Sequence, residues 1–138
     1  MNSSAGSQTT SNSPNITATK TTIGMNGYVA VNQNNQYHEA VLFRSMVGFS
    51  KVGSFAGSDS AQTINLGFSP RFLFIKNINN NEYWPYFDTT RGSNNLLMLN
   101  NGNGGSTVSG WVTATASGMT LKGNELALNK SGYTYIYY

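Results

Sequence analysis

The chain has 138 residues, enough for one domain with or without a tail, and it lacks cysteine, which excludes disulfides, thiolate catalysis and cysteine-based zinc sites. Only 9% of its residues are charged, against roughly 25% in an average globular protein, and the net charge is +3. The lysines and arginines are scattered rather than clustered, and no window approaches the ~20 apolar residues of a membrane span. We therefore expect neither nucleic acid nor a membrane as a partner.

The first 24 residues are rich in Ser, Thr, Asn and Gln and contain almost nothing to bury. Such a segment cannot offset its ordering entropy alone, so it is either a disordered tail or an arm that becomes ordered on a neighbouring subunit. We favour the arm, with Pro14, Ile16 and Ile23 as its contact points. No basic segment followed by an apolar core begins the chain, so we do not expect a signal peptide. The predicted organisation is an arm over residues 1–24 and a β domain over residues 25–138.

Short alternating or apolar runs then follow one another, separated by turns rich in Gly and Asn. Residues 37–46 predict a strand whose buried part is 41–43. Residues 49–57 alternate cleanly and predict a strand that places Phe49 and Phe55 on one face.

Residues 66–76 form the densest apolar run of the chain. Four consecutive apolar residues, 72–75, suit a strand covered on both faces at the centre of a sandwich. Phe72 and Phe74 should lie on one face, and Leu73 and Ile75 on the other.

The aromatic run at residues 82–88 predicts a strand, in which Pro85 suggests an edge position or a bulge. Further strands are expected at 96–99 and 108–115, the latter pairing with 117–121 through a tight turn. Residues 124–130 give only a hint of a helical turn, and residues 132–138 close the chain as a strand. The pattern predicts an all-β fold, an antiparallel β-sandwich or jelly roll.

Ionisable residues give no support for catalysis. His38 and Glu39 are adjacent on a predicted strand and point to opposite faces, so they cannot act as a base and its orienting partner. No pair of carboxylates has a spacing that suggests a glycosidase, and Asp88 with Arg91 is expected to bridge within a loop. No cluster resembles a metal site, so we predict no enzyme activity, no metal and no cofactor.

Aromatic residues are the strongest candidates for contact with another molecule. Tyr combines contact area with a polar tip and is favoured at protein interfaces, although the same rings could stack on sugars. We rate subunit contact above a sugar site. The candidate interface or ligand residues are Trp84, Tyr86, Trp111, Tyr133, Tyr135 and Tyr137.

Five short segments, in order over residues 47–138, resemble a module of tailed-phage structural proteins. The first resembles the pattern GFSK-x-GSY-x-G, and the others are LGF-x-P-x-F-x-x-IK, a Trp followed by FD-x-x-RG, SG-x-x-L, and N-x-x-G-x-TYIY. The matching stretches here are 47–57, 66–76, Trp84 with 87–92, 117–121 and 129–137. Residues 57–60 depart from the module, where a G-N-G type of turn would be expected.

The resemblance implies a non-enzymatic β-rich virion component of a tailed phage. A nearly stand-alone module behind a polar arm suits a capsid cement or decoration protein, which would sit on the capsid surface as a homotrimer and contact the major capsid protein or other virion proteins. The alternative is a tail-fibre or appendage module, located on the tail, that binds host-surface carbohydrate. A third possibility, a polysaccharide-degrading enzyme, has no carboxylate pair to support it.

Overall fold

A computed structural model describes residues 16–18, 23–25, 34–37, 41–92, 95–99, 106–108 and 110–138. The chain divides into two compact units, Ser7–Leu42 and a larger unit that contains Phe43–Tyr138. In the smaller unit, strands β1 (Ile16–Ala18) and β2 (Ile23–Met25) pair in antiparallel fashion, with Ile16 opposite Met25. Ile23, which was also predicted as a contact point of the arm, lies in β2 opposite Ala18. Pro14 lies outside the described residues, so the arm stays a prediction.

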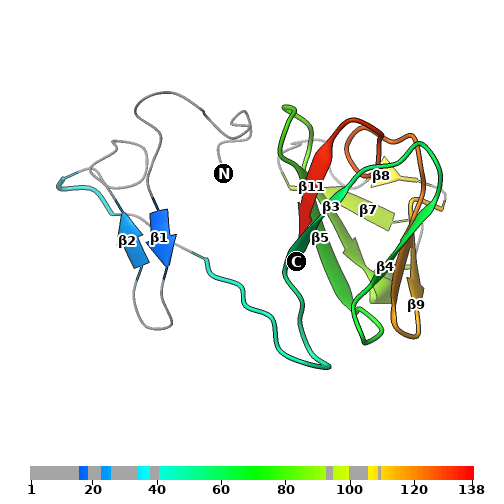
Figure 1. Ribbon diagram of the computed structural model, residues 1–138, viewed down its shortest axis with the longest axis horizontal. Coiled ribbons are helices and arrows are strands. Elements are labelled where there is room, and N and C mark those ends of the chain that lie inside the picture. The colour runs from blue at the N-terminus through cyan, green and yellow to red at the C-terminus, as the bar shows by residue number, and fades with distance from the viewer. Residues whose placement is uncertain are drawn as a thin grey trace. The chain divides into compact units, whose positions relative to one another are not determined.

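The larger unit consists of two antiparallel sheets (Figure 1). The three-stranded sheet has the order β4-β10-β9 and the six-stranded sheet the order β3-β11-β5-β6-β7-β8. The strands of the smaller sheet are β4 (Gln62–Asn65), β9 (Val112–Thr115) and β10 (Gly118–Leu121). Those of the larger sheet are β3 (Gly53–Ala56), β5 (Phe72–Asn77), β6 (Pro85–Asp88), β7 (Asn95–Met98), β8 (Ser106–Thr107) and β11 (Thr134–Tyr137).

The all-β sandwich predicted from the sequence is confirmed. A 3-10 turn, η1 (Thr89–Arg91), follows β6. In the part of the chain that the structure describes, no helix is long and apolar enough to span a membrane. The predicted hairpin is also confirmed, because Gly118 of β10 pairs with Thr115 of β9 across a tight turn.

The core lies between the two sheets and draws on alternate residues of each strand. Leu73 and Ile75 of β5 are buried, and they pack in one cluster with Met119 and Leu121 of β10. The prediction for these two residues of β5 is thus confirmed. The expectation that β5 is covered on both faces is wrong, since Phe72 on the opposite face is 42% exposed. The six-stranded sheet therefore has an inner face in the core and an outer face that the smaller sheet does not cover.

Gly118 is required where β10 meets β4. Gly118 pairs with Asn65, and a Cβ added to Gly118 would collide with the carbonyl oxygen of Ile64. Only glycine lets the two backbones approach this closely. The close pairing fixes the register of the smaller sheet, in which Met119 lies opposite Ile64 and faces the core.

Three sequence expectations are corrected by the structure. Val41 and Leu42 are each 68% exposed and residues 41–43 form no strand, although we expected them to be buried in one. Residues 49–52 belong to a turn and its exit, so the strand predicted over 49–57 is limited to β3. Pro85 is not at an edge: β6 lies between β5 and β7, and Pro85 is its first residue, where a missing amide donor is tolerated.

Candidate interaction surface

The outer face of the six-stranded sheet carries a row of aromatic rings that contact one another. Phe43 stacks on Tyr138 at a centroid distance of 3.8 Å, Tyr138 meets Phe72 edge-on at 6.0 Å, and Phe72 lies 4.8 Å from Tyr86. We call these four residues the aromatic row. Aromatic pairs at these distances are stabilising beyond the area they bury. The contacts between the rings therefore hold the side chains of the row in place on the surface.

A second aromatic pair lies beside the row and is backed by a buried cation. Phe74 and Trp84 have ring centroids 5.1 Å apart, and the Lys76 amine lies 5.4 Å from the Trp84 ring centroid. Lys76 is only 3% exposed, and its amine donates to the carbonyl oxygen of Glu82 at 2.7 Å. Burial lowers the pKa of Lys76, an effect that the Glu82 carboxylate partly opposes. Lys76 therefore makes a cation–π contact with the Trp84 ring.

A pocket of about 460 Å³ opens on this face, and we call it the outer pocket. Its walls contain no charged side chain. The residues that line it come from β3, β5, β11 and the segments beside them, and they are Phe43, Val52, Gly53, Ser54, Phe74, Trp84, Ile136, Tyr137 and Tyr138. Its volume and composition are typical of sites that hold an apolar group.

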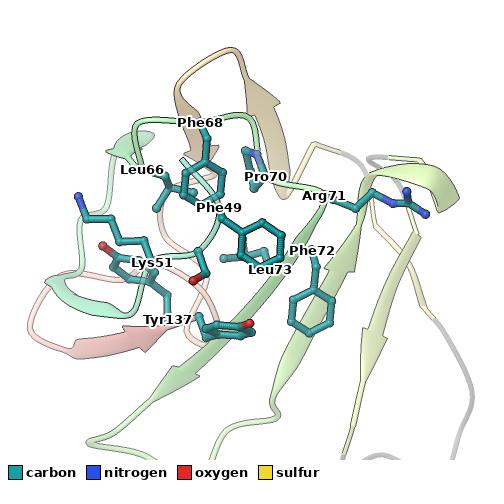
Figure 2. A pocket seen from close by; sticks show the side chains of 11 residues that line it. Phe49, Lys51, Leu66, Phe68, Pro70, Arg71, Phe72, Leu73 and Tyr137 are labelled. Carbon is teal, nitrogen blue, oxygen red and sulfur yellow. The ribbon is translucent and has the colours of Figure 1, made fainter. Parts of the chain in front are cut away.

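A second pocket, of about 360 Å³, lies among the loops that flank β5, and we call it the loop pocket. Figure 2 shows the ring of Phe49 between those of Phe68 and Phe72, above Leu73. The two cationic residues at its rim point away from its centre: Lys51 reaches the backbone carbonyl of Asn65, and Arg71 pairs with a carboxylate. The interior is therefore apolar, and it is partly occupied by a side chain of the same molecule.

A polar cluster lies in the loops that follow β3 and precede β11, and it contrasts with the apolar outer face. Asn129 is fully buried; its Oδ1 accepts the Ser58 N–H at 2.7 Å and its Nδ2 donates to the Ser60 carbonyl at 3.1 Å. These two bonds join the loop after β3 to the turn before β11. A buried amide that satisfies backbone groups in this way is structural.

The Tyr135 hydroxyl continues the polar cluster inside the sandwich. It donates to the Leu126 carbonyl at 2.9 Å and accepts the Lys130 N–H at 3.0 Å, while Asn77 Nδ2 lies at 3.4 Å. Burial raises the pKa of this hydroxyl. Among the described residues, no buried side-chain nitrogen or oxygen lacks a hydrogen-bond partner. The cluster thus has no free group to offer a ligand.

The predicted aromatic site residues separate into two groups. Trp84 and Tyr86 lie on the outer face, as an interface or ligand site requires. Tyr135 is 0% exposed and Tyr137 is also buried, because the inner positions of β11 face the core. For Tyr135 the expectation of an interface is corrected, whereas Tyr137 also lines the outer pocket and the loop pocket. Trp111 and Tyr133 are partly buried against the same core.

The carboxylates take structural roles. Asp88 caps η1 by accepting the Thr90 N–H at 2.8 Å, and this bond, together with the ion pair to Arg71 at 3.3 Å, lowers its pKa. Asp59 bonds Lys130 at 3.1 Å, which lowers its pKa as well. In the described ranges, no group of three His, Asp or Glu residues could hold a metal ion. His38 and Glu39 lie outside these ranges.

A family model described as a domain of unknown function, DUF7483, matches residues 1–138. The chain belongs to the DUF7483 family. No curated protein and no solved structure is significantly similar to this DUF7483 chain. The outer face and its pockets are therefore the features of this DUF7483 domain that point to a function.

Sequence reasoning missed three residues of the aromatic row in this DUF7483 chain, Phe43, Phe72 and Tyr138. Phe72 was expected to be covered, and Phe43 to be a buried strand residue. Phe72 and Tyr86 lie diagonally across the β5–β6 pair, in which Phe72 is opposite Asp88. Pairing of these two aromatic strands is the signal that could have placed Phe72 beside Tyr86. The sequence alone does not state that β5 and β6 are neighbours, so the row could not be read from it.

Proposed function

We propose that this protein is a non-enzymatic structural component of a tailed-phage virion, a capsid cement or decoration protein on the head surface. The observation that carries the proposal is the aromatic row, which presents Phe72 and Tyr86 on an open sheet face. Exposed contiguous aromatic surface marks protein contact, and aromatic residues are enriched at interface centres. The low charge and the resemblance of residues 47–138 to a phage module support the same reading.

Decoration of purified heads tests this proposal. The wild-type protein should bind heads that lack it, and cryo-EM should show many copies over the shell. Phe72→Asp should reduce occupancy at least about tenfold, because it puts a charge into a contact that excludes water. The matched control is Tyr83→Asp, at a ring of similar exposure outside the aromatic row. Copies confined to the tail, or equal decoration by both variants, would contradict the proposal.

The second candidate is a tail module that binds host-surface carbohydrate. The observation in its favour is the pair Trp84 and Tyr86, whose partly exposed rings could stack on sugar faces. Titration of the isolated protein with host-surface polysaccharide separates the two functions. Saturable binding that Trp84→Ala abolishes, together with a tail location, would favour this candidate over the first.

A further inference from the structure

Residues 44–52, which lead into β3, form an ordered hairpin that we call the apolar hairpin. The Met46 N–H donates to the Ser50 carbonyl at 2.8 Å, and the Ser50 N–H returns a bond to the Met46 carbonyl at 3.0 Å. The Ser50 hydroxyl donates to the Arg44 carbonyl at 2.8 Å. Gly48 at the turn has a φ of +73°, a conformation that glycine adopts at low cost. These bonds hold the tip in one shape.

The tip of the apolar hairpin exposes apolar side chains. Val47 is fully exposed, Phe49 is 75% exposed, and Met46 is about half exposed. Phe49 turns toward the loop pocket of its own molecule (Figure 2), whereas Val47 contacts no other part of the described chain closely enough to lose exposure. No charged residue lies between Arg44 and Lys51. An ordered turn that presents uncharged apolar groups is suited to insertion into an apolar pocket.

The outer pocket has the complementary chemistry. None of its lining side chains is charged, and its lining includes Ile136, which is 41% exposed. The loop pocket is a poorer receptor, because Phe49 already lies over it and Lys51 and Arg71 are at its rim. The hairpin and the outer pocket are adjacent, since Val52 of the hairpin and Phe43 just before it both line the pocket.

We propose that the tip of the apolar hairpin of one molecule, centred on Val47, fills the outer pocket of a second copy of this chain. Among the described residues nothing covers Val47 or fills the outer pocket, so each copy carries an apolar tip beside an apolar pocket. A two-fold axis between them lets two copies exchange hairpins, so that both contacts form at once in an isologous interface. The partner is therefore the same chain, and the inference does not depend on the virion proposal.

Sedimentation velocity of the purified full chain tests self-association between ~1 µM and ~1 mM, a range that covers weak protein contacts. Wild-type protein should associate reversibly. Val47→Asp in the tip and Ile136→Asp in the pocket should each weaken association at least about tenfold, because each buries an unpaired charge. Leu99→Asp is the matched control, at a similarly exposed apolar residue outside both features, and should associate as wild type does. A wild-type monomer over the whole range would overturn the proposal.

A mixing experiment distinguishes contact in trans from a general loss of structure. Val47→Asp protein retains an intact pocket, and Ile136→Asp protein retains an intact tip, so an equimolar mixture should recover one of the two contacts. Association in the mixture should exceed that of either variant alone. Failure to recover, with both variants folded by circular dichroism, would overturn the proposal.

Cysteine cross-linking locates the contact directly, because the natural chain contains no cysteine. A mixture of Val47→Cys and Ile136→Cys proteins should form a mixed disulfide dimer under mild oxidation. A mixture of Leu99→Cys and Ile136→Cys proteins is the control and should give several-fold less. Equal yields from the two mixtures would show that the tip does not enter the pocket. If the cysteine variants cross-link as expected but the wild-type protein does not bind phage heads, only the virion proposal is contradicted.

Discussion

The polar cluster buries polar groups within the sandwich, whereas the outer face exposes apolar groups. In the polar cluster, Asn77, Asn129 and Tyr135 are buried, and each uses its polar atoms on neighbouring groups. On the outer face, Phe72 and Ile136 are apolar and remain exposed. Polar groups that are buried and satisfied stabilise the fold, while apolar groups left in water are available for a partner. Substitutions in the first region should therefore alter stability, and those in the second should alter binding.

The largest effect is expected at Asn129. Asn129→Ala removes the bonds to the Ser58 N–H and the Ser60 carbonyl and leaves a buried space, so the free energy of unfolding should fall by about 2–3 kcal/mol. Urea denaturation measures this change. The control is Asn65→Ala, at the exposed last residue of β4, where the side chain accepts the Gly67 N–H at 3.0 Å, and it should cost less than about 1 kcal/mol. Equal losses would mean that the polar cluster is not a main source of stability.

A smaller loss is expected from removal of one hydroxyl. Tyr135→Phe leaves the ring in the core but removes the bonds to the Leu126 carbonyl and the Lys130 N–H, which should cost about 1–2 kcal/mol. Tyr137→Phe is a matched control on the same strand face, because no hydrogen bond holds that hydroxyl among the described residues. If thermal or urea denaturation shows the same change for both, the hydrogen bonds of Tyr135 are not the cause.

The sandwich could be predicted because burial imposes a period of two on its strands. Leu73 and Ile75 were expected on one face of β5 and Phe72 and Phe74 on the other; the structure keeps these two faces, but only the face of Leu73 and Ile75 lies in the core. The same rule failed at residues 49–52. Phe49 and Lys51 have the two-residue spacing of one strand face, but Gly48 takes a positive φ and the Met46–Ser50 bonds close a turn. The local hydrogen-bonded turn thus outweighed the alternating pattern of residues 49–57.

The candidate surface could be predicted only in part, because which face is covered is a property of the whole fold. Trp84 and Tyr86 were identified from their residue types. Tyr135 and Tyr137 have the same residue type as Tyr86, and only the packing of β11 against the smaller sheet places them in the core. Asn129 shows the same limit, since an Asn in a turn-forming segment carries no signal that its amide bridges a distant loop.

Acid should weaken the fold modestly through Asp59 and Asp88. Hydrogen bonds from Lys130 and from the Thr90 N–H hold the pKa values of Asp59 and Asp88, respectively, below the ordinary 3.8. A carboxylate with a lowered folded pKa contributes stability that is fully present above 3.8 and is lost as pH falls through the folded value. Unfolding free energies from about pH 6 to about pH 2 should therefore decline.

Asp59→Asn assigns part of that decline. The difference in unfolding free energy between wild type and this variant should shrink as the pH falls below 3.8, because the wild-type carboxyl becomes neutral as well. A difference that stays constant across the range would show that the Lys130 pair does not contribute through charge.

The smallest effect on stability is expected on the outer face. Phe72→Ser removes an aromatic side chain that is 42% exposed and contacts Tyr86 and Tyr138, so the free energy of unfolding should fall by about 1 kcal/mol. Leu73→Ala, one residue along the same strand but in the core, should cost about 3 kcal/mol and shows that the assay resolves the difference. A loss at Phe72 as large as that at Leu73 would mean that the outer face is part of the stability core, and the reason for treating it as a binding surface would disappear.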